Sequence, residues 1–503
     1  MTASLPHVYP GAPASMLSPR RRSREQDQTA SRTVDVLVIG GGITGVGVAL
    51  DAATRGLDVA LVESNDLAFG TSRWSSKLVH GGLRYLAQGQ VGVAYESAVE
   101  RERLMAAIAP HLTHPLAQVL PVIHGVHPRL VQAGLRAADG LRRATGSTLA
   151  PPRRLDNSEA LTLAPGMIDG ADGAWLSWDG QLIDDARLVV AVARTAAAYG
   201  ARILTHTEVL GIDGPNVGGS GAQQVRVADS LTGERWTISA RRVVNATGAW
   251  AAELDDRVEL IRSRGSHLVV SAKSLGNPTG ALMVPVEGST SRFVFALPEA
   301  EGLAYIGLTD VETEDPLDSP TASQEEIDFL LHTINRGLRS PLTHDDVIST
   351  YAGYRPLLAG RGDSSADLSR RHAVLDGDVI SVVGGKLTTY RRMAEDVVDL
   401  LTDRPCRTKR LPLVGAQPWR GGVDRLTARF GSESELVRDC AGPAGALPVG
   451  DTPVLGCELT WAIAAEGAIT EADILERRLR LDLMPAWQQQ VAQALAAGAS
   501  AAA

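Results

Sequence analysis

The chain has 503 residues, of which 44% are hydrophobic and 21% are charged, and its formal net charge is −9. This length exceeds what a single hydrophobic core usually holds, so we expect two or three domains. The composition is that of a globular protein. The acidic balance argues against a nucleic-acid-binding protein, because such proteins need a basic surface.

Cysteine usage and hydropathy indicate the compartment. The three cysteines, Cys406, Cys440 and Cys457, are far apart and form no CxxC pair. This predicts a reducing, cytoplasmic location and no structural metal. No stretch is apolar enough to span a bilayer. Residues 1–32 contain the string PRRRSREQ, but the apolar stretch of an export signal does not follow it. Their Pro, Ser and Arg content predicts a disordered tail.

Residues 34–63 carry the strongest functional signal. An apolar run is followed by Gly40, Gly42 and Gly45, then by a helix pattern, then by a second apolar run that ends at Glu63. The three glycines permit a tight turn, the approach of a pyrophosphate to the backbone, and close packing of helix on strand. The helix N-terminus offers free N–H groups to phosphates, and Glu63 can accept hydrogen bonds from a ribose. The segment predicts a dinucleotide-binding βαβ unit.

The following elements are predicted from periodicity and from glycine and proline positions. A loop rich in Gly, Ser and basic residues at 66–86 precedes a helix at about 94–108. Residues 116–163 are expected to form an insertion over the first domain. A loop, a helix and a strand are predicted over 180–204, and alternating patterns over 265–309 predict a second, largely antiparallel sheet.

The last hundred residues predict a separate helical unit. A Pro-, Arg- and Gly-rich boundary at 404–417 precedes a mostly helical region. Thr470 and Asp473 have the spacing of a capping box, so a helix is expected to begin there.

Two further segments repeat the design of the first unit. Residues 246–248 and 384–389 each follow an apolar strand and carry glycine and small residues before a helix. In doubly wound sheets, ligands bind at the carboxyl ends of the strands. Three such units spread along the chain suit a long flavin dinucleotide better than a single nicotinamide nucleotide.

These features resemble a known family. The stretches that carry the resemblance are, in chain order, DVLVIGGGITGVGVALDAATRGL, SSKLVHGGLRYL, DDARLV, VNATGAW, GSHLVV, TDVE, GYRPL and GGKLTTYRRMAE. Together they closely resemble the FAD-dependent glycerol-3-phosphate dehydrogenases, within the D-amino-acid-oxidase-like flavoproteins. The resemblance covers about 34–401 and extends weakly over about 421–495. The chain departs from the family at Arg73 and Trp74, where many relatives have small residues, and at Leu308, where a threonine is expected.

The resemblance implies the fold class and the domain order. We expect an α/β protein with a Rossmann-like FAD-binding domain, an antiparallel-sheet substrate domain and a helical C-terminal cap. The first two domains are expected to interleave over 33–403, with the substrate sheet mainly at about 255–375, and the cap to occupy 404–503.

The resemblance also implies the reaction and the partners. We expect FAD-dependent oxidation of sn-glycerol 3-phosphate to dihydroxyacetone phosphate by hydride transfer from C2 to the flavin. Electrons would pass to a quinone at the inner face of the cytoplasmic membrane, on which the protein would be peripheral. The oligomeric state stays open, with a homodimer among the candidates.

The chemistry then points to particular side chains. A base is needed for the C2 hydroxyl, and His80 in SSKLVHGGLRYL is favoured because imidazole titrates near neutrality. His267 in RGSHLVV is the rival base. A guanidinium can grip two oxygens of a phosphate at once, which favours Arg355 in GYRPL, while Arg84, Tyr85, Arg370 and Lys386 are further substrate-binding candidates.

The remaining expected contacts are to the cofactor. They are Gly40, Gly42, Ile43, Thr44, Gly45 and Glu63 in the first unit, Thr71, Ser75 and Ser76 in the loop after it, and Thr247, Gly248, Gly385, Lys386, Leu387 and Thr388 in the later units.

Three other functions remain open at this point. A glycerol-3-phosphate oxidase would pass the electrons to oxygen. An amine oxidase of the same flavoprotein group would need a carboxylate-binding pocket without a phosphate grip. A flavin-holding protein without turnover would keep the cofactor but would have no need of the basic, histidine-containing loop.

Overall fold

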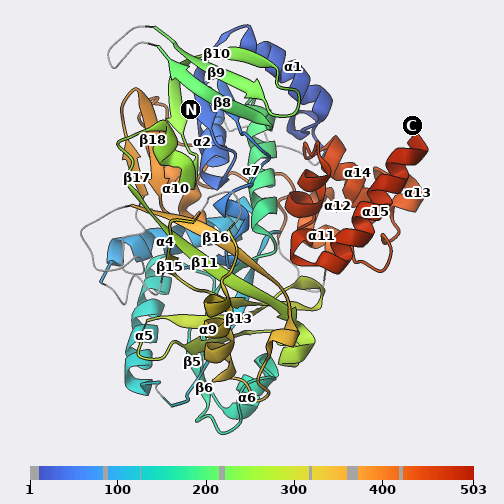
Figure 1. Ribbon diagram of the computed structural model, residues 1–503. Coiled ribbons are helices and arrows are strands. Elements are labelled where there is room, and N and C mark those ends of the chain that lie inside the picture. The colour runs from blue at the N-terminus through green and yellow to red at the C-terminus, as the bar shows by residue number, and fades with distance from the viewer. Residues whose placement is uncertain are drawn as a thin grey trace.

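The computed structural model describes residues 11–82, 89–124, 126–214, 221–289, 291–315, 320–358, 372–418 and 423–502. Figure 1 shows three parts: a sheet flanked by helices at the top, a second sheet below it, and a group of helices at the side formed by the C-terminal residues. This arrangement confirms the expected fold class, with a Rossmann-like domain, a second sheet domain and a helical C-terminal domain.

The first sheet has the strand order β17-β18-β10-β1-β2-β7, and β8 and β9 extend it beside β10. Pairing is parallel between β18, β10, β1, β2 and β7. Helices α2, α7 and α10 pack together and form one core with the sheet. The bounds are β1 Thr33–Ile39, α2 Ile43–Thr54, β2 Val59–Val62, α7 Asp185–Ala198, β7 Arg202–Leu204, β8 Thr207–Asp213, β9 Gln223–Asp229, β10 Arg235–Asn245, α8 Ala251–Leu254, β17 His372–Leu375, β18 Val379–Gly384 and α10 Tyr390–Val398.

The second sheet has the order β15-β11-β14-β13-β12-β4-β6-β3, with β16 paired to β11 and β5 paired to β6. Helices α9 and α6 contribute apolar residues to its core. The bounds are β3 Leu78–Val79, α4 Val91–Arg103, β4 Thr113–Pro121, α5 Pro128–Ala144, β5 Arg153–Leu155, α6 Asn157–Leu163, β6 Ala174–Leu182, β11 Leu260–Ser271, β12 Ala281–Pro285, β13 Phe293–Pro298, β14 Leu303–Gly307, β15 Val311–Glu312, α9 Gln324–Asn335 and β16 Val347–Leu358.

One expectation about this sheet is wrong. Residues 116–163 do not form an insertion over the first domain, because β4 and β5 pair with β6 inside the second sheet. Six of its ten strands, β11 to β16, lie within 255–375, whereas β3 to β6 precede residue 255 and β17 belongs to the first sheet. Strand pairing between segments far apart in the sequence decides both points, and local periodicity does not reveal it.

The expected disorder of residues 1–32 is also wrong where the chain is described. Residues 19–30 form helix α1 (Pro19–Ala30), which Ser18 caps by accepting a hydrogen bond from the Arg21 N–H. Arg22 forms an ion pair of 2.8 Å with Asp229 of β9. The arginines that indicated a solvated tail thus have partners far away in the sequence, and residues 1–10 lie outside the described part.

The C-terminal residues form a helical domain with its own apolar clusters. The expected capping box is confirmed: the Thr470 N–H donates to Asp473 Oδ2 and the Asp473 N–H donates to Thr470 Oγ1. The π-helical turn Asp473–Arg478 begins there. The other helices are α11 Arg425–Phe430, α12 Ser434–Asp439, α13 Gly442–Gly445, α14 Gly456–Ala464 and α15 Pro485–Ala502.

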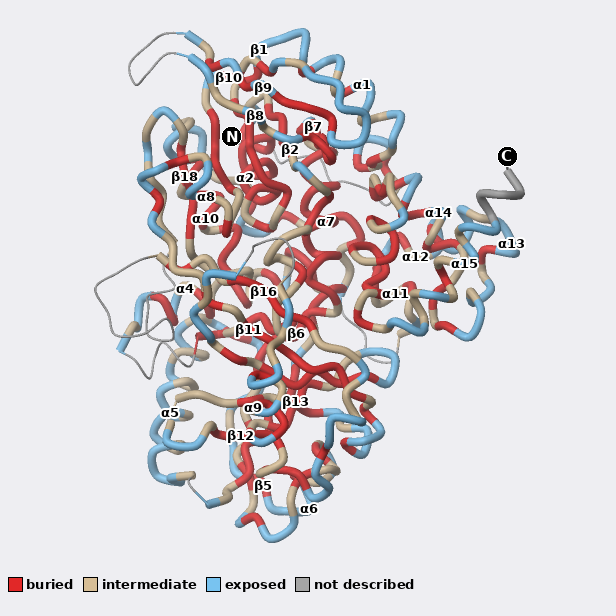
Figure 2. Tube along the Cα trace, viewed as in Figure 1, coloured by how far each residue is buried: buried red, intermediate tan, exposed pale blue. Residues whose placement is uncertain are grey.

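Helix α7 lies between this domain and the first sheet, and nearly all of its residues are buried (Figure 2). Arg187 and Arg194 of α7 form buried ion pairs with Glu466 (2.7 Å) and Glu433 (2.6 Å) of the helical domain. His111 is buried nearby, and burial together with the Arg187 guanidinium lowers the pKa of His111 to about 3. The domain interface is therefore densely charged but holds a neutral histidine.

We predict that His111→Gln reduces the loss of stability at acid pH. Unfolded His111 binds a proton near its ordinary pKa of 6.5, whereas the folded side chain stays neutral down to about 3. Stability contributed by this group is therefore present above pH 6.5 and falls as the pH drops below that value. The melting temperatures of both proteins are measured at about pH 7.5 and about pH 5. The fall in melting temperature from the higher to the lower pH should be smaller in His111→Gln than in the wild-type protein. Equal falls in the two proteins would contradict this prediction.

Candidate functional site

A cavity of about 1010 Å³ lies where β1, β10 and β18 end and continues to the second sheet. All three predicted strand–glycine–helix units line it, as do both candidate histidines and Arg355. The predicted residues that line it are Gly40, Gly42, Ile43, Thr44, Glu63, Thr71, Ser75, Ser76, His80, Thr247, Gly248, His267, Arg355, Gly385, Lys386, Leu387 and Thr388.

The turn after β1 has the geometry that the glycines predicted. Gly40 has φ +110°, in a region that side chains rarely adopt. Gly45 does not line the cavity. A Cβ atom on it would lie 1.9 Å from the Gly40 carbonyl oxygen, so glycine is needed there for close packing of α2 on the turn. Glu63 accepts hydrogen bonds from the N–H groups of Gly41 (2.6 Å) and Asn65 (2.9 Å), and burial raises its pKa.

A residue that the sequence analysis missed completes this end of the site. Ser72 Oγ accepts the Ile43 N–H at the start of α2, at 2.9 Å. Ser72 also lines the cavity. It lies in the same TSRWSSK segment as the predicted Thr71 and Ser75, and only the fold shows which of these hydroxyls meets the helix.

In the two later strand–glycine–helix units, glycine residues leave the backbone accessible from the cavity. Gly248, Gly384 and Gly385 have φ of +62°, +73° and +72°. A Cβ atom on Gly385 would lie 2.4 Å from Met393 Sδ, so a side chain would not fit there. Thr388 follows in a short helical turn, and its backbone continues into α10.

The loop between these ends is held by its own hydroxyl groups. Thr71 Oγ1 donates to the Tyr354 carbonyl oxygen at 2.5 Å, and the Ser75 N–H and Oγ both donate to Asp185 Oδ2, at 2.9 and 2.8 Å. Ser76 Oγ lies 2.8 Å from His267 Nε2. These hydroxyls thus shape the loop by binding protein groups while the residues line the cavity.

His267 is a buried, neutral histidine at the wall of the cavity. Its ring stacks on Tyr351 with 4.5 Å between centroids, and a Cβ atom on Gly307 would lie 2.0 Å from the ring, so Gly307 makes room for it. Burial, Arg355 and Lys77 lower its pKa well below the ordinary value. Within the described part of the chain, its buried Nδ1 atom has no hydrogen-bond partner.

His80 is half-exposed in the cavity and faces a carboxylate. Its Nδ1 atom lies 3.9 Å from Asp179 Oδ2, and the Gly81 N–H and the Arg101 guanidinium both bind Asp179 Oδ1 at 2.9 Å. Asp179 was missed by the sequence analysis. It is the one charged residue of β6 (AWLSWDGQL), and a lone carboxylate in such a strand is a usable signal.

Arg355 points along the second sheet toward a carboxylate. Its Nη1 atom lies 3.3 Å from Asp310 Oδ1, and its Nη2 atom donates to the Thr309 carbonyl oxygen at 3.2 Å. Gly265 on the neighbouring strand makes room, because a Cβ atom there would lie 1.9 Å from Nη2. Lys386 binds Ser97 Oγ through its ammonium group.

Three predicted substrate contacts, Arg84, Tyr85 and Arg370, lie outside the described residues. Among the residues that are described, no group of three or more His, Cys, Asp or Glu side chains could hold a metal ion, and no helix could cross a membrane.

Comparison with known proteins identifies the family. Residues 35–391 match the FAD dependent oxidoreductase family. Glycerol-3-phosphate dehydrogenase 1 of Mycobacterium tuberculosis is 48% identical over 95% of this chain and 97% of that protein. The aerobic glycerol-3-phosphate dehydrogenase of Staphylococcus saprophyticus is 32% identical over 95% of this chain and 93% of its own length.

Solved structures agree. The glycerol-3-phosphate dehydrogenase of Bacillus halodurans, complexed with FAD, aligns with a TM-score of 0.73 and 30% identity over 96% of this chain and 94% of that one. The L-alpha-glycerophosphate oxidase of Mycoplasma pneumoniae shares the fold, with a TM-score of 0.60 and 19% identity over 77% of this chain and 100% of that one. The chain therefore belongs to the FAD-dependent oxidoreductases and, among them, to the glycerol-3-phosphate dehydrogenases.

Proposed function

We propose that this protein oxidises sn-glycerol 3-phosphate to dihydroxyacetone phosphate with FAD as its cofactor. One observation carries the proposal: a single cavity joins the glycine turns of three parallel strands to His80, His267 and Arg355. When bound, FAD supplies the hydride acceptor, which no side chain can provide.

The residues present fit this cofactor. The turn at Gly40–Gly42 and the N-terminus of α2 suit a pyrophosphate, because the helix dipole favours negative charge there. Glu63 suits a ribose, and the backbone at Gly248 and Gly385 suits the close approach of a flat ring. The cavity is at the upper end of the roughly 300–1,000 Å³ typical of ligand sites, as an extended dinucleotide with a small substrate requires.

Arg355 is proposed to bind the substrate phosphate. Asp310 and the Thr309 carbonyl oxygen hold its guanidinium in a fixed position beside the cavity. A planar guanidinium can donate two parallel hydrogen bonds to a phosphate. Lys386 and, beyond the described residues, Arg84, Tyr85 and Arg370 are proposed as further substrate contacts.

His80 is proposed as the base that removes the C2 hydroxyl proton. Asp179 lies on its Nδ1 side and would stabilise the imidazolium that forms. His267 is poorly suited to the role of base, because burial and two nearby cations lower its pKa and oppose its protonation. We assign His267 a different role, in which a neutral imidazole bound to Ser76 helps to orient the substrate oxygen.

A membrane quinone is proposed as the electron acceptor, and helix α5 supports this. Leu130, Val131 and Leu135 of α5 line the cavity. Arg129, Arg136 and Arg143 of the same helix are exposed. A helix with an apolar side and exposed arginines suits the surface of an anionic membrane, from which a lipophilic quinone could enter.

The reaction is tested by anaerobic titration of the FAD-loaded protein with glycerol 3-phosphate. The flavin absorbance should bleach stoichiometrically, whereas sarcosine and D-amino acids should leave it unchanged. Quinone in anionic vesicles should then restore the colour faster than oxygen does. Bleaching by the amines but not by glycerol 3-phosphate would contradict the proposal. Faster reoxidation of the flavin by oxygen than by quinone would identify oxygen as the electron acceptor.

His80→Ala is expected to retain FAD but to slow flavin reduction by about a hundredfold or more, the usual effect of losing a general base. His344→Ala, at an exposed histidine of the second domain, serves as a control and should behave like the unchanged protein. A near-normal rate in His80→Ala would remove His80 from the role.

Arg355→Ala should mainly weaken substrate affinity, raising the concentration needed for half-maximal reduction by about tenfold or more. Gly265→Ala should also raise the substrate concentration needed for half-maximal reduction, because the added methyl group would displace the Arg355 guanidinium. Arg339→Ala, at an exposed arginine paired with Asp169, is the matched control. An unchanged concentration dependence in Arg355→Ala would exclude the proposed phosphate contact.

A further inference from the structure

The chain between β2 and β3 forms a long wall of the cavity. Its lining residues include Glu63 and Asn65 at one end and Trp74 and Ser76 at the other. Residues 63–77 contain the short helical turn Thr71–Arg73 and no strand. Side-chain contacts from elsewhere in the molecule add to a few backbone hydrogen bonds in holding this segment.

Asp66 supplies the first of these contacts, on the side away from the cavity. Its carboxylate accepts hydrogen bonds from Arg478 Nη1 at 2.6 Å, from Arg478 Nη2 at 2.9 Å and from Arg477 Nε at 2.9 Å. Asp66 is fully buried, and Arg477 and Arg478 of the C-terminal domain are only 4% and 1% exposed. One carboxylate of the cavity wall thus holds two guanidinium groups of another domain.

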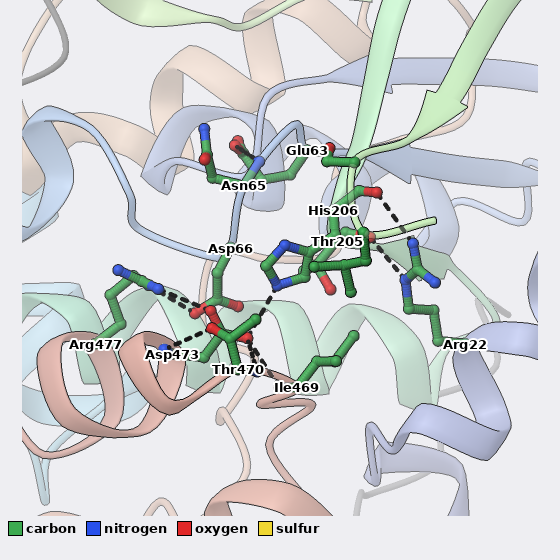
Figure 3. Close-up of polar contacts among 12 residues, drawn as sticks. Arg22, Glu63, Asn65, Asp66, Thr205, His206, Ile469, Thr470, Asp473 and Arg477 are labelled. Atoms are coloured by element: carbon green, nitrogen blue, oxygen red, sulfur yellow. Dashed lines mark hydrogen bonds and ion pairs between the residues drawn. The ribbon is translucent and has the colours of Figure 1, made fainter. Parts of the chain in front are cut away.

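The contacts continue and return to the same segment (Figure 3). Arg477 Nη2 donates to Asp473 Oδ1 at 2.7 Å, and Asp473 Oδ2 lies 2.9 Å from His206 Nε2. The His206 N–H donates to the carbonyl oxygen of Asn65, the residue before Asp66, at 2.6 Å. Asp66, Arg477, Asp473 and His206 therefore form a ring of contacts that the peptide bond between Asn65 and Asp66 closes. We call it the Asp66 ring.

The ring is rigidly built. Asp473 is fully buried, and although burial alone would raise its pKa, hydrogen bonds from His206 and from the Thr470 N–H hold the pKa of Asp473 well below its usual range. His206 has φ +52°, a conformation that non-glycine residues rarely adopt. Its side chain reaches the C-terminal domain while its N–H reaches Asn65.

A second anchor lies further along the segment. Arg480, just after the same π-helical turn, donates from Nη2 to the Arg73 carbonyl oxygen at 2.9 Å. Arg73 Nη1 forms an ion pair of 3.0 Å with Glu476, and its guanidinium lies 4.3 Å from the ring of Trp74. Arg73 and Trp74, the residues that depart from the family, thus belong to this contact with the C-terminal domain.

A separate ion pair, outside residues 63–77, also joins the C-terminal domain to the first domain. Arg194 and Glu433 form a bidentate pair of 2.6 and 3.0 Å between α7 and the C-terminal domain, and both side chains are 2% exposed. Like the four side chains of the ring, neither residue lines the cavity, but the ring also binds the carbonyl oxygen of Asn65, which does. This pair and the Asp66 ring join the same two domains, but only the ring touches the cavity wall.

We propose that the C-terminal domain holds the cofactor in place through the Asp66 ring. The ring fixes residues 63–77 in the shape that binds FAD, so its members are positioning residues for the cofactor. The proposal rests on the FAD dependence of the family and is independent of the substrate and of the acceptor.

The test compares Asp66→Asn with Glu433→Gln in the full-length protein. Both variants remove one carboxylate charge from a buried ion pair between the domains, which takes a counter-charge away from buried arginines. FAD affinity is measured by titrating the FAD-free protein and following flavin fluorescence. Melting temperature and hydrogen exchange of residues 63–80 are measured on the same FAD-free samples.

Asp66→Asn should weaken FAD binding by about tenfold or more and should speed hydrogen exchange in residues 63–80. Glu433→Gln should lower the melting temperature but leave the FAD affinity within about twofold and the exchange of this segment unchanged. An FAD affinity of Asp66→Asn equal to that of Glu433→Gln would overturn the proposal, because the ring would then be only one more ion pair of the fold.

Arg477→Lys decides the outcome if Asp66→Asn does not fold. It keeps the positive charge and the contacts between Asp66 and Arg478 but loses the fork that binds Asp66 and Asp473 together. Weaker FAD binding supports the ring, and unchanged binding overturns it. Glycerol 3-phosphate should still bleach any variant that is loaded with excess FAD. Failure of that bleaching in the unchanged protein would count against the proposed reaction and not against the ring.

Discussion

The site depends on one constraint of parallel sheets: strands β1, β10 and β18 all end at the same edge. Each is followed by glycine or small residues and then by a helical turn. Parallel pairing fixes the three ends relative to one another, and the absence of Cβ atoms leaves backbone N–H groups accessible there. A long dinucleotide can therefore lie along an edge that no single βαβ unit could provide.

In the proposed function the second sheet supplies the residues that bind and react with the substrate, and its glycines make room for them. Gly307 and Gly265 lie on strands β14 and β11, and each leaves space that a large polar side chain of a neighbouring strand fills. His267 and Arg355 are held in that space against the cavity. Their positions thus depend on cross-strand packing.

Sequence reasoning predicted the features that are local. The β1–α2–β2 unit, the role of Gly45 in packing and the Thr470–Asp473 capping box all depend on residues within a few turns of one another, and the structure has them. Features that depend on distant partners were missed or wrong. Ser72 at α2 required the fold to be known, and although Asp179 stands out as the lone carboxylate of β6, only the fold places it beside His80. Helix α1 was mistaken for a disordered tail because the partner of Arg22, Asp229, lies 207 residues further along the chain.

The central claim is that one cavity receives both FAD and the substrate. The most direct measurement is a crystal structure of the protein with FAD and glycerol 3-phosphate. The account predicts the pyrophosphate at residues 40–44, the flavin ring beside residues 384–388, and the substrate phosphate on Arg355 with its C2 hydroxyl facing His80. Density for the substrate phosphate away from Arg355, or for the flavin ring outside this cavity, would contradict the account.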